Sequence, residues 1–213
     1  MQQNKSHAVM AQRHEAADSL DFFPTPPWAT RALCEWLGVV KWENRAIYSS
    51  RRRTVWEPAC GQGHMARPLG EFFDDVYASD IHDYGYGDVK NFFLVEDIRH
   101  DWIITNPPFN LAENFAKWAL KCASDGVALL VRTAFLEGVG RYSRLFNCFA
   151  PTDILQFSER VPMRKGRLDP TQSTATAYCW VVWNLDSHAD LGTKFHWLPP
   201  CRKRLERSED YVL

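Results

Sequence analysis

A short apolar run that leads into a glycine-rich turn constrains the fold of this chain more than any other feature. Residues 54–56 (Thr-Val-Trp) have the character of a strand, and Glu-Pro-Ala-Cys-Gly-Gln-Gly-His-Met-Ala follows at 57–66, before helical sequence that continues to Phe73. Gly61, Gly63 and Ala66 have the G-x-G-x-x-G/A spacing of a nucleotide-binding strand–turn–helix unit. Glycines permit a tight turn that lets a ligand approach the backbone at a helix N-terminus. The motif therefore predicts an α/β fold with a nucleotide-type site.

The next strand-like run, at 75–80, ends in an acid that supports this interpretation. Asp80 follows the start of the motif by about 20 residues, the separation expected of a carboxylate that binds ribose hydroxyls. A dinucleotide-dependent oxidoreductase would use the same two features, but no part of the sequence resembles a hydride-transfer site. Another motif favours a different chemistry.

That motif is Asn106-Pro107-Pro108-Phe109, which directly follows the apolar run at 102–105. Each proline fixes its own φ and pushes the preceding residue toward extended geometry, so the segment is a stiff turn. It presents acceptors, namely the Asn106 side chain and the carbonyls of Asn106 and Pro107, beside an aromatic ring. Such a turn suits a planar amine, whose two hydrogens need acceptors and whose face can stack on the ring. The simpler alternative is a proline-capped strand end with a core phenylalanine.

Together these motifs resemble those of the S-adenosylmethionine-dependent amino methyltransferases, especially the small bacterial and phage-type adenine-N6 DNA methyltransferases. The resemblance extends from Asp21 to about Trp183. Residues 106–109 match the catalytic tetrapeptide of the family, and Asp80 matches its ribose-binding acid. Residues 21–28 look like the segment that contacts the methionine end of the cofactor. The resemblance implies that S-adenosylmethionine is bound by Phe23, Thr25, Pro26, Glu57, Pro58, Ala59, Gly61, Gly63, Asp80, Ile81, Asp97 and Asn106.

Predicted strands and helices alternate along the chain, as in a single doubly wound α/β domain. The resemblance implies a Rossmann-like methyltransferase sheet of seven strands, the last of them antiparallel. We expect residues 1–20 to be a flexible N-terminal tail, 21–200 the methyltransferase domain and 201–213 a basic C-terminal tail. Apart from the elements already named, the apolar patterns predict helices at 26–39 and 111–122 and strands at 127–131, 153–157 and 176–183.

Composition excludes several other classes of protein. Hydrophobic residues make up 46% of the 213 residues, too many for a disordered chain. No apolar run approaches the roughly 18 residues of a membrane span, and the first 20 residues lack the apolar core of a signal peptide. The six cysteines form no C-x-x-C pair, and the seven histidines show no ligand spacing with them. We therefore expect a cytoplasmic protein without a metal and without a membrane partner.

Basic residues gather in three places despite the net charge of −1. The cluster of most interest, formed by Arg160, Arg164, Lys165 and Arg167, lies in a predicted loop between the last two predicted strands. Clustered arginine near a base-binding turn suits neutralisation of phosphates, so we expect this loop to contact a nucleic-acid backbone. An ordinary solvated loop is the alternative. The other clusters lie at 51–53 and 202–207.

The resemblance implies methyl transfer to the exocyclic N6 amine of adenine in DNA; the motifs themselves are more specific for methyl transfer than for the substrate. A duplex target would have to be flipped out of the helix, with Phe109 stacking on the extruded ring. Four alternatives remain open: RNA adenine methylation, DNA cytosine-N4 methylation, protein-glutamine methylation, and a non-catalytic cofactor-binding partner subunit. A cytosine-C5 enzyme would need a nucleophilic Pro-Cys, but Pro200-Cys201 lies beyond the last predicted strand. The chain offers little sequence for target recognition, so we expect sequence specificity either to be low or to be supplied by the partner in a homodimer.

Overall fold

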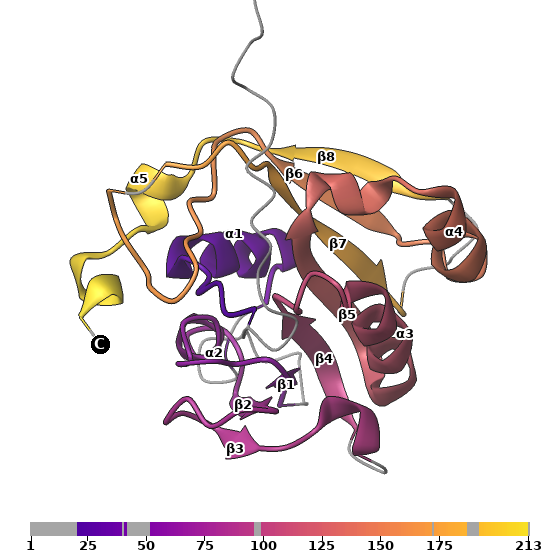
Figure 1. The fold of residues 1–213 in the computed structure, drawn as a ribbon, viewed down its shortest axis with the longest axis horizontal. Coiled ribbons are helices and arrows are strands. Elements are labelled where there is room, and N and C mark those ends of the chain that lie inside the picture. The colour runs from indigo at the N-terminus through magenta and orange to yellow at the C-terminus, as the bar shows by residue number, and fades with distance from the viewer. Residues whose placement is uncertain are drawn as a thin grey trace, which may run out of the picture.

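One mixed β-sheet forms the centre of the molecule (Figure 1). The computed structural model describes residues 21–39, 41, 52–95, 99–171, 173–186 and 192–212. Within these residues eight strands pair in the order β3-β2-β1-β4-β5-β7-β6-β8. Their bounds are β1 Thr54–Glu57, β2 Asp75–Asp80, β3 Asp88–Val89, β4 His100–Thr105, β5 Ala123–Arg132, β6 Asp153–Phe157, β7 Tyr178–Asn184 and β8 Lys194–Leu198.

The direction of the strands confirms the predicted fold. β7 is antiparallel to both of its neighbours, β5 and β6, and every other pairing in the described sheet is parallel. The first seven strands thus form the doubly wound, Rossmann-like methyltransferase sheet, with the seventh strand antiparallel. The sequence analysis did not predict the eighth strand, β8, which extends the sheet beyond β6. Phe195 and Trp197 on β8 are more than half exposed, so the strand lacks the buried apolar pattern that marked the others.

Five α-helices and several 3₁₀ or π turns lie before, between and after the described strands. Helix α1, predicted at 26–39, ends at Leu37 because Gly38 takes the left-handed conformation (φ 64°) that stops a helix. The helix predicted after the glycine-rich turn is shorter than expected, because the chain leaves it in a turn at Gly70. The bounds are α1 Pro27–Leu37, α2 Ala66–Leu69, α3 Ala112–Cys122, α4 Val139–Arg141 and α5 Arg202–Leu205, with 3₁₀ turns η2 Phe92–Leu94, η3 Thr133–Leu136 and η6 Ser208–Tyr211 and a π turn η4 Tyr142–Phe146.

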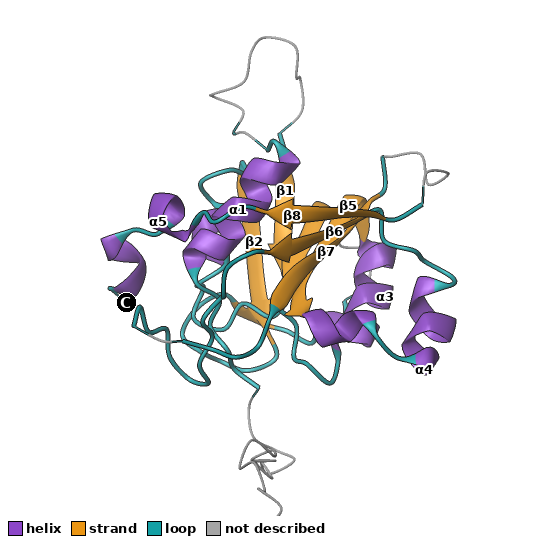
Figure 2. Cartoon of the chain, turned by 90° about the horizontal axis from the view of Figure 1, so that it is seen from above, coloured by secondary structure: helices purple, strands orange, loops and turns teal. Residues whose placement is uncertain are grey.

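Both faces of the sheet are covered, and each face has its own apolar core (Figure 2). Side chains alternate between the two faces along each strand. On β7, for example, Trp180 packs with α1, whereas the next residue, Val181, packs with α3. This two-sided burial explains why β5 and β7 are almost continuously apolar. Among the described helices, none has the length and apolar character needed to cross a membrane.

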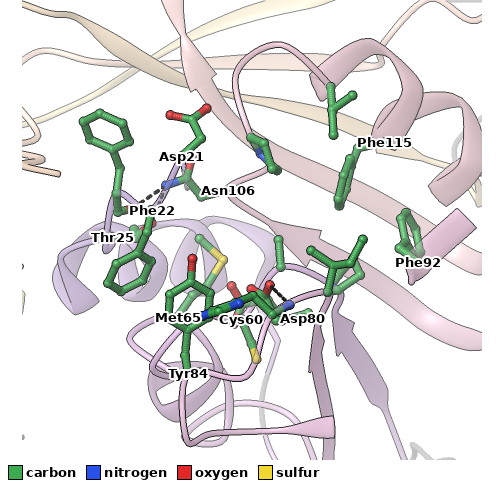
Figure 3. Close-up of a pocket in the computed structure, with 18 of the residues that line it drawn as sticks. Asp21, Phe22, Thr25, Cys60, Met65, Asp80, Tyr84, Phe92, Asn106 and Phe115 are labelled. Atoms are coloured by element: carbon green, nitrogen blue, oxygen red, sulfur yellow. Dashed lines mark hydrogen bonds between the residues drawn. The ribbon is translucent and has the colours of Figure 1, made fainter. Parts of the chain in front are cut away.

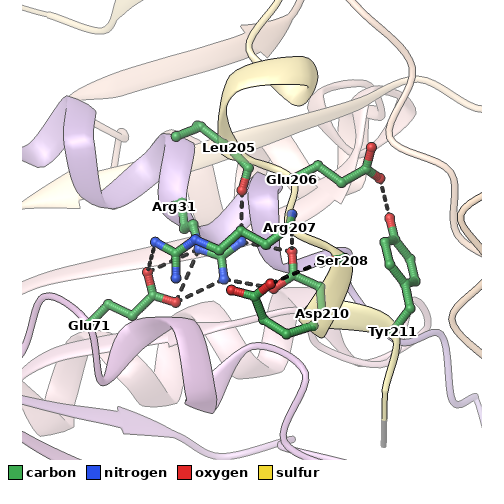
Figure 4. Close-up of polar contacts among 9 residues, drawn as sticks. Arg31, Glu71, Leu205, Glu206, Arg207, Ser208, Asp210 and Tyr211 are labelled. Carbon is green, nitrogen blue, oxygen red and sulfur yellow. Dashed lines mark hydrogen bonds and ion pairs between the residues drawn. The ribbon is translucent and has the colours of Figure 1, made fainter.

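A buried arginine ties the C-terminal residues to the rest of the domain (Figure 4). Arg31 of α1 is 3% exposed, and its guanidinium contacts the carboxylates of Glu71 (2.8 Å) and Asp210 (2.7 Å). The same group donates to the carbonyl of Leu205 at 2.7 Å, and Arg207 pairs with Glu71 at 2.9 Å. The residues after 200, which the sequence set apart as a basic tail, therefore pack against α1, because their charges meet partners of opposite sign.

Replacing Arg31 with methionine is expected to lower the free energy of unfolding by about 3–5 kcal/mol. The reason is that the Asp210 side chain, 4% exposed, would remain buried without its cation. Urea denaturation followed by circular dichroism measures this loss. The double variant R31M/D210N is the control, since it removes both charges and should recover part of the stability. A loss below about 1 kcal/mol for R31M would contradict the prediction.

Candidate active site

A deep cavity opens at the carboxyl ends of β1, β2 and β4 (Figure 3). Parallel strands gather their carboxyl ends at one edge of a sheet, and ligands bind there at the point where the strand order reverses. In this sheet the order reverses between β1 and β4. The empty space amounts to about 850 Å³, open mouth included. Among the predicted site residues, the cavity is lined by Phe23, Thr25, Glu57, Pro58, Ala59, Asp80, Ile81, Asn106 and Pro108.

The remaining predicted residues lie next to the cavity or away from it. Pro107 and Phe109 belong to the same turn as Asn106 but do not line the cavity, and neither does Pro26, which precedes α1. Gly61 and Gly63 shape the turn behind the lining. Asp97 lies outside the described residues. None of the basic residues predicted to bind nucleic acid, Arg160, Arg164, Lys165 and Arg167, lines it either.

The glycine-rich turn is held against the end of β2. Gly61 has a left-handed φ of 50°, and its N–H donates to Oδ2 of Asp80 at 2.9 Å. The other oxygen of that carboxylate accepts from the N–H of His82 at 3.1 Å. A Cβ at position 61 would lie 2.3 Å from the ring of Phe22, so only glycine fits both the backbone and the neighbouring ring. Asp80 is therefore anchored by the turn and faces the cavity.

Asn106 has a fixed orientation. Its Nδ2 donates to the carbonyl of Phe23 at 3.0 Å and to Oγ1 of Thr25 at 3.1 Å, and lies 3.5 Å from the sulfur of Met163. A carbonyl can only accept, so the contact with Phe23 decides which end of the amide is nitrogen. The other end, Oδ1, is buried and has no hydrogen-bond partner among the described residues. A buried acceptor without a donor is costly, which suggests that a ligand donates to it.

The segment 21–25 connects the parts of the site. Oδ2 of Asp21 accepts from the backbone N–H of Phe109 at 2.7 Å. The ring of Phe22 stacks on Tyr84, with centroids 4.7 Å apart, and its carbonyl accepts from the N–H of Gly166 at 2.9 Å. Through these contacts the segment joins the turn at 106–109, the loop after β2 and the basic loop between β6 and β7. The basic loop thus lies beside the cavity although its charged side chains do not enter it.

Two rings and a cation meet at the end of the tetrapeptide. Phe109 is half-buried, and its ring packs against Phe23 with centroids 5.0 Å apart. The guanidinium carbon of Arg132 lies 3.6 Å from the centre of the Phe109 ring. Arg132 is exposed and is the last residue of β5. The sequence analysis gave it no role.

Two buried titratable groups face the cavity. Burial raises the pKa of Glu57 well above its ordinary value, and the charge of Asp80 raises it further, while a hydrogen bond from the backbone of Ala66 opposes both. Its Oε2 has no hydrogen-bond partner among the described residues. Burial lowers the pKa of His64 to about 4, with the charge of Arg67 acting in the same direction. His64 is therefore neutral near pH 7. The raised pKa of Glu57 means that a cationic ligand bound beside this group would favour its ionised form.

Sequence reasoning missed several residues at the cavity. His64 and Met65 belong to the glycine-rich motif but were assigned no function, and Asp21 was named only as the start of its segment. Tyr84 and Lys90 come from the stretch after β2, whose sequence carries no motif that could have indicated them. Aromatic side chains complete the wall. The additional lining residues include Asp21, Phe22, His64, Met65, Tyr84, Lys90, Phe92, Phe93 and Phe115.

The structure gives no support to a cysteine nucleophile. Cys201 is 5% exposed, does not line the cavity, and has its pKa raised to about 11, chiefly by burial. Burial likewise raises the pKa of Cys60, beside the glycines, to about 12. Both are thiols near neutral pH, and a thiol is a poor nucleophile. Within the described residues, no three or more histidine, cysteine or acidic side chains gather as metal ligands would.

Solved structures share this fold. One is the methyltransferase subunit of a type I restriction-modification system from Streptococcus thermophilus, with a TM-score of 0.53 and 9% identity over 76% of this chain and 44% of that one. Another is a dimethyladenosine transferase from Plasmodium falciparum, with a TM-score of 0.50 and 13% identity over 76% of this chain and 63% of that one. The chain therefore spans less than two thirds of the length of either protein. No family model matches the sequence, and no curated protein matches it. The fold is that of S-adenosylmethionine-dependent methyltransferases.

Proposed function

We propose that this protein is an S-adenosylmethionine-dependent methyltransferase that acts on the N6 amine of adenine in DNA. The observation that carries the proposal is the hydrogen bonding of the Asn106 side chain. Its Nδ2 is engaged by Phe23 and Thr25, and its buried Oδ1 has no donor among the described residues. An amide oriented in this way at the wall of a cavity is ready to accept a hydrogen bond from an amine.

The residues present fit the cofactor. Glu57 is a buried carboxyl group with an unpartnered oxygen, which suits a ligand that carries an ammonium group and a sulfonium. Asp80 is anchored by backbone N–H groups through one lone pair on each oxygen, and the others can accept from ribose hydroxyls. Phe23, Thr25, Pro58, Ala59 and Ile81 would surround the rest of the molecule. When bound, S-adenosylmethionine supplies an electrophilic methyl group.

The tetrapeptide would make a poor nucleophile reactive. The lone pair of an aromatic amine is delocalised into its ring, so the nitrogen attacks weakly. Oδ1 of Asn106 and the carbonyl of Pro107 would each accept one amine hydrogen and so localise that lone pair on nitrogen. These hydrogen bonds strengthen as positive charge develops, which makes them transition-state interactions rather than uniform binding. Asn106 does not act as a base, since the methylated nitrogen is acidic enough to lose its proton afterwards.

Two features support a nucleic acid rather than a protein as substrate. The aromatic ring of Phe109 beside Asn106 suits stacking on a base that has been flipped out of a duplex. The basic loop lies against the segment that holds Asn106, since Gly166 donates to the carbonyl of Phe22. The two proteins of similar fold named above, a restriction-modification methyltransferase subunit and a dimethyladenosine transferase, also have names that refer to nucleic-acid methylation or to adenosine. DNA is the first choice, because the tetrapeptide matches DNA adenine methyltransferases.

Nucleoside mass spectrometry tests the proposal. The protein is incubated with S-adenosylmethionine and unmethylated DNA, with total RNA in a parallel tube and a tube without cofactor as control. We expect N6-methyladenine in the DNA tube alone. Product only in the RNA tube, or methylated cytosine in either tube, would overturn the substrate while keeping the chemistry. No product in either tube, despite cofactor binding measured by calorimetry, would overturn nucleic-acid methylation altogether.

Neutralising the basic loop should weaken DNA binding and leave cofactor binding intact. For the triple variant R164A/K165A/R167A, we expect the slope of log affinity against log salt to become less steep by about 0.9 for each phosphate that the loop no longer neutralises. Asp169, which lies 3.3 Å from Arg167 and 3.9 Å from Arg164, already offsets part of this charge, so the change in slope should correspond to fewer than three phosphates. Fluorescence anisotropy of a labelled duplex measures both the affinity and the slope.

The matched control removes three charges elsewhere. Arg52 and Arg53 directly precede β1, at the edge of the sheet opposite to the cavity, and Arg51 is the residue before them in the chain. The variant R51A/R52A/R53A should therefore leave the salt slope unchanged. If both triple variants behaved like the wild-type protein, the loop would have no role in DNA binding.

A further inference from the structure

The stacking face of Phe109 already has an occupant. The guanidinium carbon of Arg132 lies 3.6 Å from the centre of the Phe109 ring, which is the distance at which planar groups stack. The ring of Phe23 also packs against Phe109, with centroids 5.0 Å apart. A flat base that stacks on the face beneath Arg132 would need the volume that the guanidinium now fills. The Arg132 guanidinium and the base therefore compete for the same face of the Phe109 ring.

Arg132 is free to give up this place without disturbing the core. It is exposed, at the carboxyl end of β5, whereas the preceding residue, Val131, is buried. Its other neighbour is Tyr178. Burial raises the pKa of Tyr178, and the hydrogen bond with Arg132 lowers it. Tyr178 is 3% exposed and is fixed on β7, so its hydroxyl helps to hold the guanidinium over Phe109 until a stronger partner displaces it.

The chemistry of the guanidinium indicates where it would go. A guanidinium makes bidentate, charge-assisted hydrogen bonds with phosphate, and these are stronger than an exposed contact with a neutral ring. A nucleic-acid base placed against Phe109 carries a backbone phosphate with it, one sugar away from the ring. Moving the guanidinium from the Phe109 ring to a phosphate therefore replaces a weak contact with a stronger one.

We propose that Arg132 is a substrate-binding residue that covers Phe109 until a nucleotide arrives and then binds a phosphate of that nucleotide. This inference rests on the proposed function, since it requires a nucleic-acid substrate. It assigns Arg132 a role in selecting a base that is attached to a phosphodiester backbone. A free amine, or a glutamine side chain, would displace the guanidinium without offering it a partner.

The test compares R132A, R132K and R52A. Arg52 precedes β1 at the opposite edge of the sheet, so R52A removes the same charge away from the cavity. Anisotropy of a fluorescein-labelled duplex is measured over a salt series in the presence of S-adenosylhomocysteine, and KM and kcat are measured for DNA methylation. For R132A we expect about tenfold weaker DNA binding, a salt slope less steep by about 0.9 and a raised KM. R132K should retain most of the slope, because lysine also binds phosphate as a point charge.

Two results would overturn the inference. One is an R132A variant whose affinity, salt slope and KM equal those of R52A. The other is an R132A variant that binds DNA more tightly than the wild-type protein, which would make Arg132 a cover that binds no phosphate. Both results are distinct from failure of the proposed function, which would appear as wild-type protein that methylates neither DNA nor RNA. Cofactor affinity, measured by calorimetry, should be equal in all three variants and shows that each is folded.

Discussion

Replacing Asn106 with alanine is expected to lower kcat for methyl transfer about 100- to 1,000-fold, the usual cost of removing one preorganised hydrogen-bond partner of a developing charge. Loss of Oδ1 removes an acceptor that would act mainly in the transition state, so kcat should fall more than KM changes. Single-turnover measurement of methylated product, with DNA and cofactor at saturation, isolates this step. If N106A kept more than a tenth of the wild-type kcat, Asn106 could not have the assigned role.

Thr25 offers a matched test of how Asn106 is held. Its Oγ1 accepts from Nδ2 of Asn106 at 3.1 Å, whereas the other acceptor, the carbonyl of Phe23, belongs to the backbone and survives any side-chain change. T25V keeps the shape of the side chain but removes the acceptor, so the amide should lose part of its orientation. We expect a fall in kcat of about tenfold, corresponding to about 1.4 kcal/mol, and recovery in T25S, which restores the hydroxyl. Equal losses in T25V and T25S would show that Thr25 acts through packing instead.

Much of the fold could be predicted because the buried strands of a mainly parallel sheet have a recognisable apolar pattern in the sequence. β5 and β7, which are buried on both faces, contain continuous apolar runs, and β2 and β6 have the predicted bounds of 75–80 and 153–157. The topology of a parallel sheet also predicts that Glu57, Asp80 and Asn106 share one edge of the sheet, since each lies at or just after the carboxyl end of a parallel strand. β3 could not be found in this way, because it has two residues and both are exposed.

The parts of the site that the sequence did not reveal come from segments far apart in the chain. Met163 reaches Asn106 from the loop between β6 and β7, and Arg132 reaches Phe109 from β5. Neither residue belongs to a local motif with a spacing that a turn or helix would impose. Segment 21–25 contacts both the turn at 106–109 and the basic loop, and so brings these distant parts of the chain together. Local chemistry is visible in sequence, whereas such contacts depend on the tertiary structure.

Replacing Glu57 with glutamine should weaken cofactor binding and at the same time stabilise the cofactor-free protein. Ionisation of Glu57 is disfavoured in the folded state by burial and by the charge of Asp80, so its pKa is raised above the ordinary value of 4.5. Above pH 4.5 the unfolded chain loses this proton while the folded protein retains it. The free energy of unfolding therefore falls as the pH rises from 4.5 toward the raised pKa, and the penalty then stays constant. E57Q cannot ionise and escapes that penalty.

Cofactor affinity should respond to pH in the direction opposite to stability. A ligand with an ammonium group favours the ionised carboxylate, so binding to the wild-type protein should release a proton and tighten as the pH rises toward the raised pKa. In E57Q the hydrogen bond to a charged group is lost, which corresponds to a decrease in affinity of roughly 10- to 100-fold. Calorimetry in buffers of different ionisation enthalpy measures the affinity and the proton release together, and thermal unfolding from pH 5 to pH 8 measures the stability.

E137Q is the matched control, because Glu137 is exposed and does not line the cavity. It should bind the cofactor with wild-type affinity and show the wild-type dependence of stability on pH. The two effects of E57Q have opposite signs, so a general loss of structure cannot produce both. An E57Q protein that was less stable than wild type at pH 8, or that bound the cofactor as tightly as E137Q, would show that Glu57 does not hold the cation. A higher melting temperature of E57Q together with weaker cofactor binding would instead identify Glu57 as a group that destabilises the folded protein by its burial but binds the cofactor.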